Sequence, residues 1–258
     1  MNGIKAVVKL IAVPLFECLS WLSRKFAALM HRFLFYSEWF YDAPHNFDHQ
    51  VDLYYQWGRN RNSFWLERGI YNVLAIQVFD HPNVVELSCG DGFNAYYFYS
   101  YYADKVFACD IDRIAIKKAM KKYKAENLLY EALDIRDNLK ETIAKQGHVT
   151  NVIWDTAMAY FTPDEIHSII KEIKEVLKDS KGILSGHTIQ ASGGGKFFQH
   201  KYEFKDMEDL RSFFTPYFKN VIVFETKSKT GAHNYYFYAS DGEIPFTNEW
   251  SHWMVTGM

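Results

Sequence analysis

Short β-rich runs alternate with helical runs from about residue 80 onward, and this alternation limits the possible folds more than any other feature. The β-rich runs occupy residues 83–87, 105–109, 128–133, 151–154 and 182–186, and a closing pair of strands is expected at 221–225 and 234–239. Strands that alternate with helices form a parallel sheet, because each crossover helix returns the chain to the same edge. The pattern predicts an α/β fold.

Three helical runs have readable boundaries or faces. The aromatic run after residue 92 predicts a helix that extends to about residue 102. Thr162, Pro163 and Glu165 predict a helix start, since together they provide a capping box and a proline in the first turn. The run 114–123 is expected to turn one face inward, made of Ala115, Ile116, Ala119 and Met120.

The first strand ends in a loop suited to close approach of a ligand. Gly90 and Gly92 allow a sharp turn without a Cβ in the way, and the following helix offers unpaired N–H groups. Gly90, Gly92 and Ala95, with Asp110 further along, also satisfy a loose dinucleotide fingerprint. An NAD(P)-binding enzyme of the Rossmann type is therefore one interpretation of the loop.

The residues around the loop resemble the first motif of class I S-adenosylmethionine-dependent methyltransferases. Glu86 matches the acidic position of that motif, and Gly90 and Gly92 match its last two glycines. Ser88 stands where the family more often has glycine. The resemblance covers about residues 83–240. It implies a Rossmann-like, doubly wound, mostly parallel seven-stranded sheet with an antiparallel last strand, and S-adenosyl-L-methionine as the cofactor.

The resemblance also assigns roles at successive strand ends. Asp110 matches the acid that binds both ribose hydroxyls, and Ile111 would lie against the adenine. Asp134 matches the acid that meets the adenine amino group, with Ile135 beside it. The full set implied for the cofactor is Glu86, Ser88, Gly90, Asp91, Gly92, Asp110, Ile111, Asp134 and Ile135. Independently, acidic groups near the loop suit a sulfonium cation and would repel a pyrophosphate.

Candidates for catalysis follow the fourth and fifth strands, where open α/β sheets bind ligands. They are Asp155, Tyr160 and His187, with His200 as a weaker fourth. His187 is the first choice for a base, and a histidine that caps a strand end is the alternative. The segment 52–71 mixes aromatic and cationic residues and suggests either a lid over the cofactor and acceptor or a helix docked on the domain. No metal is expected, because Cys18, Cys89 and Cys109 lack metal-ligand spacing.

The N-terminal region has a different character. Residues 1–36 carry five basic side chains and the single acid Glu17, although the whole chain has a net charge of −2. An apolar stretch from residue 6 is interrupted too often for a spanning helix. Apolar residues then recur at helical spacing, at Leu22, Phe26, Leu29, Met30, Phe33 and Leu34. This pattern is typical of a helix lying in a membrane interface, with packing on the domain or on a second subunit as the alternative.

The expected organisation is an amphipathic basic extension (1–40), a helical lid or cap (41–80), a methyltransferase domain (81–242) and a tail (243–258). The expected function is methyl transfer to oxygen or nitrogen of a small-molecule, glycan or lipid-headgroup acceptor. A protein or nucleic-acid methyltransferase, and a non-catalytic cofactor-binding interaction protein, are the alternatives. No nucleic-acid partner is expected, because no basic groove is evident. The expected location is the cytoplasm, with peripheral attachment to the inner face of a membrane through residues 1–36.

Overall fold

The computed structural model describes residues 64–137, 139–190, 200–227 and 233–245, together with residues 12, 14–15, 17–23, 25–26, 29–30 and 53. Several features of the sequence lie outside the described residues. These are the glycine-rich stretch within 191–199, most of the aromatic and cationic segment before residue 64, the apolar residues Phe33 and Leu34, and the tail beyond residue 245.

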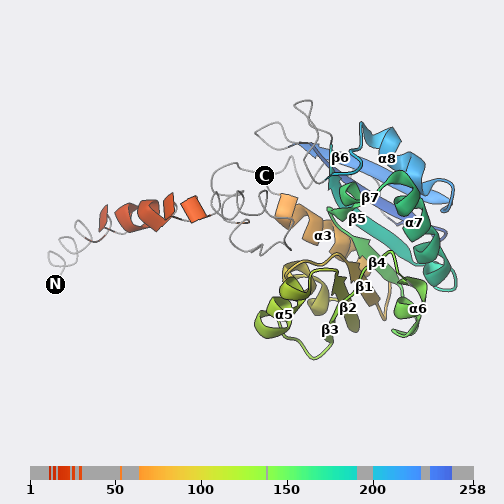
Figure 1. Ribbon diagram of the computed structural model, residues 1–258, viewed down its shortest axis with the longest axis horizontal. Coiled ribbons are helices and arrows are strands. Elements are labelled where there is room, and N and C mark those ends of the chain that lie inside the picture. Colours follow the sequence, from red (N-terminus) through yellow and green to blue (C-terminus); the bar gives the residue numbers. More distant parts are fainter. Residues whose placement is uncertain are drawn as a thin grey trace.

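A seven-stranded sheet forms the centre of the molecule (Figure 1). Its strands are β1 (Asn83–Leu87), β2 (Lys105–Asp110), β3 (Leu128–Ala132), β4 (Asn151–Trp154), β5 (Ile183–Ile189), β6 (Asn220–Lys227) and β7 (His233–Ser240). They lie in the order β3-β2-β1-β4-β5-β7-β6. The first five are parallel, and β7 runs antiparallel to both β5 and β6. The predicted α/β architecture with a reversed last strand is confirmed.

Helices cover both faces of the sheet and create two cores. On one face lie α3 (Phe64–Ile76), α4 (Phe93–Tyr97) and α5 (Arg113–Lys122). On the other lie α6 (Leu139–Ala144), α7 (Pro163–Leu177) and α8 (Met207–Phe214). Strands β1, β4 and β5 are almost entirely buried, as expected for parallel strands covered on both sides. Their carboxyl ends therefore meet at one fixed edge of the sheet.

The predicted capping box is present in α7. The Thr162 side chain accepts from the Glu165 backbone at 3.3 Å, and the Glu165 side chain accepts from the Thr162 backbone at 2.7 Å. Ile166, Ile169 and Ile173 form part of its buried stripe. The cap fixes the start of α7 close to the end of β4.

Two predictions about helices were wrong in detail. The aromatic run is not one helix to residue 102, because α4 ends at Tyr97 and a 3₁₀ turn, η2 (Tyr99–Tyr101), follows. Met120 does not point inward with Ala115, Ile116 and Ala119, since it is 53% exposed. In both cases tertiary packing determines the end of the helix or its buried face, and local periodicity does not reveal it.

Helix α3 is integrated into the domain. Glu67 accepts hydrogen bonds from Thr226 and Tyr236, both at 2.7 Å, and the Tyr238 hydroxyl donates to the Tyr71 carbonyl at 2.8 Å. Tyr71 also packs edge-on against Phe224 and Tyr236. The helix is thus held against β6 and β7, and its N-terminal half reaches the carboxyl edge of the sheet near β4 and β5.

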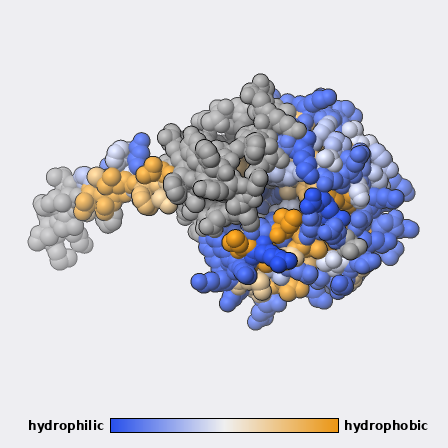
Figure 2. Space-filling view, viewed as in Figure 1, coloured by the Kyte–Doolittle hydropathy of each residue, from blue (hydrophilic) through white to orange (hydrophobic). Residues whose placement is uncertain are grey.

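The described residues between 12 and 30 are helical and lie to one side of the domain in Figure 1. Leu22, Phe26, Leu29 and Met30 are exposed there, and Phe26 is 65% exposed. Figure 2 shows this segment as largely hydrophobic surface. Among the described residues, every helix is too short or too polar to cross a membrane.

Candidate functional site

The loop from β1 to α4 contains three residues with positive φ within five positions. They are Ser88 (φ 56), Gly90 (φ 57) and Gly92 (φ 78). A Cβ on Gly92 would lie 2.6–2.9 Å from the Tyr130 ring and hydroxyl, so only glycine fits there. Ser88 adopts the left-handed conformation for which glycine is best suited. This left-handed conformation is a physical reason for the glycine that is common at the corresponding position of the class I methyltransferase motif.

Asp110 ties the ends of β1 and β2 together. One carboxylate oxygen accepts from the Gly90 backbone N–H at 2.8 Å, and the other accepts from Asp112 at 2.8 Å. Asp91 accepts from the Phe93 backbone at 3.2 Å and stabilises the start of α4. The two acids therefore shape the loop.

A cavity of about 250 Å³ opens at this edge of the sheet. It is lined by Ser88, Ile111, Leu133, Asp134, Ile135, Arg136, Tyr160, Phe161 and Lys201. Four residues predicted for the cofactor and one predicted for catalysis, Tyr160, thus line a single cavity. The apolar side chains of the lining, Ile111, Leu133, Ile135 and Phe161, suit a flat heteroaromatic ring. Polar side chains make up the rest of the lining.

Asp134 is held by a neighbouring cation at the rim of the cavity. Its carboxylate accepts from the Arg136 Nε at 2.9 and 3.1 Å, and these hydrogen bonds lower the pKa of Asp134. The Arg136 guanidinium lies 3.5 Å from Glu165, and Lys201 lies 3.0 Å from the same carboxylate. The resulting chain of alternating charges links the end of β3 to the start of α7.

A second cluster of acids lies buried beneath the same edge. Glu86 and Asp155 are 2% and 6% exposed. Asp155 accepts from Asn72 at 3.0 Å and from the Tyr99 hydroxyl at 3.1 Å. Glu86 Oε2 and Asp155 Oδ1 have no hydrogen-bond partner among the described residues. Burial raises the pKa of both carboxyl groups, because the charged form is costly away from water.

Arg68 is the buried cation of this cluster. Its guanidinium stacks on Trp65 at 3.6 Å from the ring centre, and its Nη1 donates to Thr156 Oγ1 at 2.8 Å. With the Asn94 amide turned so that its oxygen faces the guanidinium, that oxygen accepts from Nη2 and Nε at 3.2 and 3.1 Å. The charge of Arg68 lowers the pKa of Glu86 and of Asp155, and so opposes the effect of burial.

His187 belongs to the same buried cluster. It is fully buried and stacked on Phe64, with 5.7 Å between ring centres, and its Nδ1 lies 3.1 Å from Thr156 Oγ1. Burial lowers the pKa of His187 to about 3. The imidazole is therefore neutral near pH 7. Thr156 Oγ1 therefore links the Arg68 guanidinium to His187 Nδ1.

The three residues predicted for catalysis occupy different environments. Tyr160 is 39% exposed and lines the cavity, whereas Asp155 and His187 are buried in the cluster around Arg68. His200, the weaker candidate, lies 2.9 Å from Glu203 and edge-on to the Tyr160 ring, with 5.2 Å between ring centres. Tyr160 and His200 therefore lie beside the cavity, whereas His187 is buried and contacts Thr156.

Sequence reasoning missed several residues of the site. Arg136 and Lys201 line the cavity without any motif that marks them, and Asn72 and Tyr99 hold Asp155 from distant positions. Arg68 belongs to the aromatic and cationic segment that the sequence singled out, but its partner Thr156 is 88 residues away. Only that segment offered a usable signal.

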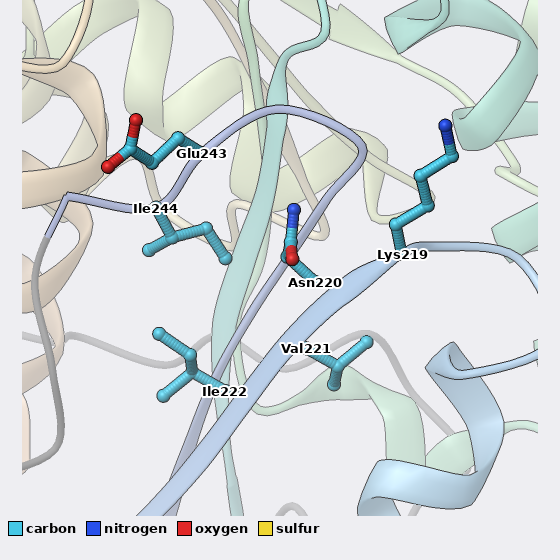
Figure 3. Close-up of a pocket in the computed structure, with 6 residues that line it drawn as sticks. All are labelled: Lys219, Asn220, Val221, Ile222, Glu243 and Ile244. Carbon is cyan, nitrogen blue, oxygen red and sulfur yellow. The ribbon is translucent and has the colours of Figure 1, made fainter.

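A larger hollow of about 510 Å³ lies elsewhere (Figure 3). It is lined by Lys219, Asn220, Val221, Ile222, Glu243 and Ile244. Asn220 and Ile183 both pair with Ser240, so β6 begins at the same edge as β5. The hollow is therefore at the amino edge of the sheet, opposite the cluster of acids. Within the described part of the chain, no group of three His, Cys, Asp or Glu side chains is placed to hold a metal.

Comparisons with known proteins agree with this geometry. Residues 84–180 match the family model described as "Methyltransferase domain". No curated protein sequence matches the chain. Among solved structures, the N-methyltransferase NodS from Bradyrhizobium japonicum WM9 is 14% identical, with 71% of this chain and 99% of that chain covered and a TM-score of 0.57.

Two further structures have the same fold with a cofactor or its product bound. Human N-acetylserotonin methyltransferase in complex with SAM is 15% identical, with 76% of this chain and 55% of that chain covered and a TM-score of 0.52. Magnesium protoporphyrin IX methyltransferase from Synechocystis PCC 6803 with bound SAH is 14% identical, with 75% and 100% covered and a TM-score of 0.50. At these identities the likeness concerns the fold.

Proposed function

We propose that this chain, whose residues 84–180 are a methyltransferase domain within a class I S-adenosylmethionine-dependent fold, methylates oxygen or nitrogen of a small-molecule, glycan or lipid-headgroup acceptor. The observation that carries the proposal is the gathering of strand-end acids and one cavity at the carboxyl edge of the sheet. Two of the similar structures are named for small acceptors, N-acetylserotonin and magnesium protoporphyrin IX, which supports this substrate class.

The residues present fit the cofactor. The cavity lined by Ile111 and Ile135 suits the adenine, and Asp110 at the end of β2 suits the ribose, because a carboxylate can accept from both hydroxyls. Glu86 Oε2 and Asp155 Oδ1 are buried acceptors with no partner among the described residues, so a cation would satisfy them. When bound, the cofactor supplies a methyl group on a positively charged sulfur.

Arg68 is proposed to hold the carboxylate of the cofactor's amino-acid part. A guanidinium is suited to a carboxylate because its donors lie in a planar fork. Trp65 and Thr156 hold this guanidinium in place. The Thr156 hydroxyl is in turn hydrogen-bonded to the neutral imidazole of His187, so we assign His187 a positioning role.

Tyr160 is proposed to contact the acceptor, with His200 and Glu203 behind it. Tyr160 lines the cavity, and the backbone N–H groups of Lys201 and Tyr202 donate to the Ala159 carbonyl at 2.8 and 3.1 Å. These bonds hold the segment with His200 against the 3₁₀ turn η3 (Ala157–Tyr160) that follows β4. Methyl transfer is an in-line displacement, so holding the acceptor in line is the main task of such groups.

The N-terminal helix is proposed to attach the protein to a membrane surface. Its exposed side chains include Leu22, Phe26 and Leu29, and a basic amphipathic helix of this kind suits an anionic lipid interface. Deletion of residues 1–36 is expected to lower binding to anionic vesicles. Unchanged vesicle binding by the shortened protein would reject this attachment.

Isothermal titration calorimetry tests the cofactor assignment. The wild-type protein is expected to bind S-adenosylmethionine and not NADH. Asp110→Asn is expected to weaken binding of S-adenosylmethionine about tenfold or more, because a charge-assisted hydrogen bond is lost. Asp179→Asn removes the same charge at an exposed position after α7 and serves as the matched control. Binding of NADH alone, or equal effects of the two variants, would overturn the assignment.

A further inference from the structure

Helix α5 carries charged residues of one sign only, and all of them are basic. Five of its ten residues are basic and none is acidic, and Lys124 follows its end. The basic residues of the helix are Arg113, Lys117, Lys118, Lys121 and Lys122. Because the whole chain has a net charge of −2, this concentration is a local segregation of positive charge. A cationic face of this kind attracts an anionic partner.

Exposed hydrophobic side chains gather around the same helix. Apart from the N-terminal helix, the described residues expose nine large hydrophobic side chains, and six of these lie between positions 97 and 120. They are Tyr97, Tyr101, Tyr102, Ile111, Ile114 and Met120. Tyr101 is 70% exposed and Ile111 is 62% exposed. Such a concentration marks an interaction surface, since scattered single residues would need no explanation.

Contacts join the tyrosines to the basic helix. The Tyr123 ring at the end of α5 lies 5.6 Å from the Tyr97 ring, and the Lys122 ammonium lies 4.9 Å above the Tyr123 ring. Asn127 donates to the carbonyls of Ser100 and Ala103 at 2.9 and 2.8 Å, which holds η2 against the segment after α5. In Figure 2, hydrophobic and hydrophilic surface alternate over the part of the molecule where Figure 1 labels α5.

We propose that this α5 face, made of the basic residues of α5 and the exposed hydrophobic residues from Tyr97 to Met120, binds an anionic membrane surface. Lysines and tyrosines suit the headgroup region, because each combines an apolar body with a polar end. The exposed aliphatic side chains Ile111, Ile114 and Met120 favour lipid over nucleic acid, since nucleic-acid surfaces are recognised by cations and stacking rings.

The α5 face borders the proposed cofactor site. Ile111 belongs to the face and also lines the cavity, and Ile114 lies in the first turn of the same helix. A domain docked through this face would hold the cavity next to the lipid headgroups. This consequence rests on the proposed methyl transfer, and it narrows the acceptor to a molecule at the membrane. Docking itself does not depend on that function.

Vesicle sedimentation with the full chain tests the proposal. The probes are vesicles of phosphatidylcholine with phosphatidylserine and vesicles of phosphatidylcholine alone. A lysine near an anionic surface adds roughly fivefold to partitioning. The double variant Lys117→Glu with Lys121→Glu is therefore expected to bind the anionic vesicles at least about tenfold more weakly. Lys171→Glu with Lys178→Glu makes the same charge change at exposed positions of α7 and its end, and is the matched control.

A second pair of variants tests the apolar part. Ile114→Gln with Tyr101→Gln is expected to weaken vesicle binding severalfold, whereas Met207→Gln, an exposed position on α8, should leave it unchanged. Equal losses for the α5 and α7 charge variants would overturn the proposal. Unchanged vesicle binding with loss of single-stranded RNA binding in the α5 variant would overturn it in favour of RNA.

Cofactor calorimetry on the same proteins separates this inference from the proposed function. The α5 variants are expected to bind S-adenosylmethionine as the wild type does, which also shows that they are folded. If the wild type fails to bind the cofactor but the vesicle results hold, the methyltransferase proposal fails and the membrane face stands. If the cofactor binds and the vesicle results fail, the reverse follows.

Discussion

Ser88 and Thr156 hold left-handed backbone conformations although both carry a Cβ, with φ values of 56° and 61°. Such conformations cost about 1–2 kcal/mol in residues other than glycine. They lie just after β1 and β4, at the edge where the strand-end acids gather. Thr156 is secured by its backbone N–H, which donates to the His187 carbonyl at 2.6 Å, and by its hydroxyl contacts to Arg68 and His187. Backbone strain is thus stored in the site itself.

Ser88→Gly tests the strain in the loop. Glycine relieves the left-handed conformation but adds about 0.5–1 kcal/mol of unfolded-chain entropy, so the free energy of unfolding should stay equal or rise slightly. Ser88→Val, which places a β-branched side chain at the same φ, is expected to lower it by at least about 1 kcal/mol. Urea unfolding measures both. A clear loss of stability in Ser88→Gly would contradict the account.

Arg68→Lys tests the proposed grip on the cofactor's carboxylate. Lysine keeps the charge but loses the planar fork that Thr156 and Trp65 orient. Affinity for S-adenosylmethionine is expected to fall about tenfold, in line with a lost hydrogen bond to a charged group. Affinity for 5′-methylthioadenosine, which lacks the amino-acid part, should be unchanged. Parallel losses for both ligands in calorimetry would show that Arg68 acts only on the fold.

The buried imidazole of His187 is expected to make the free energy of unfolding depend on pH. Burial lowers the pKa of His187 from 6.5 to about 3. Below pH 6.5 this imidazole therefore binds a proton in the unfolded chain but not in the folded protein. The contribution of neutral His187 is therefore fully present above pH 6.5 and is lost as the pH falls toward 3. The stability difference between wild type and His187→Gln is expected to shift toward the variant between pH 7.5 and 5. Comparing the two proteins cancels the opposite effect of Glu86 and Asp155. A difference independent of pH would contradict a buried neutral imidazole.

Individual site residues were predictable where a local pattern marks them. Glu86, Asp110 and Asp134 were chosen through the resemblance to the methyltransferase motifs, and the hydrophobic runs place each of them at a strand end. Their roles toward the cofactor remain predictions. Thr156 and Arg68 were not predictable as partners, since a left-handed threonine has no sequence signature and the two residues are 88 positions apart. Cavity residues such as Lys201 were not predictable either, because they belong to a loop whose path depends on the whole fold.

At the scale of elements, buried parallel strands are the features that sequence predicts best. β1 and β4 have the predicted bounds, because β-forming apolar residues such as Val84, Val85 and Leu87 lie between turn-forming segments. α6 was not predicted, since six residues carry too little periodicity. α4 ends early because Phe98 leaves helical geometry (φ −120°, ψ −62°) and the chain passes into η2. Short helices thus depend on packing more than on their own residues.

Thr162→Ala tests the capping box of α7. The variant removes the acceptor for the Glu165 backbone N–H, and the free energy of unfolding should fall by about 1 kcal/mol. Glu165 also contacts Arg136 and Lys201 at the cavity rim, so a small loss of cofactor affinity should accompany it. Thr162→Ser retains the acceptor and is the control. If serine and alanine destabilise the protein equally, the cap is not the cause.

At the scale of the whole molecule, charge is separated between two regions. Acids gather at the carboxyl edge of the sheet, and bases gather on α5. The basic N-terminal pattern could be recognised from the sequence alone, because it is local. The α5 face could not, because the exposed tyrosines of α4 and η2 join the helix only through contacts such as Tyr97 with Tyr123. A surface formed from distant segments needs coordinates.

A crystal structure of the protein with S-adenosylhomocysteine would test the central claim most directly. The adenine is expected between Ile111 and Ile135, the ribose hydroxyls on Asp110 and the amino-acid carboxylate on Arg68. Density for the ligand in the hollow lined by Lys219 and Ile244, or at the β1 loop with Asp110 and Arg68 out of contact, would contradict it.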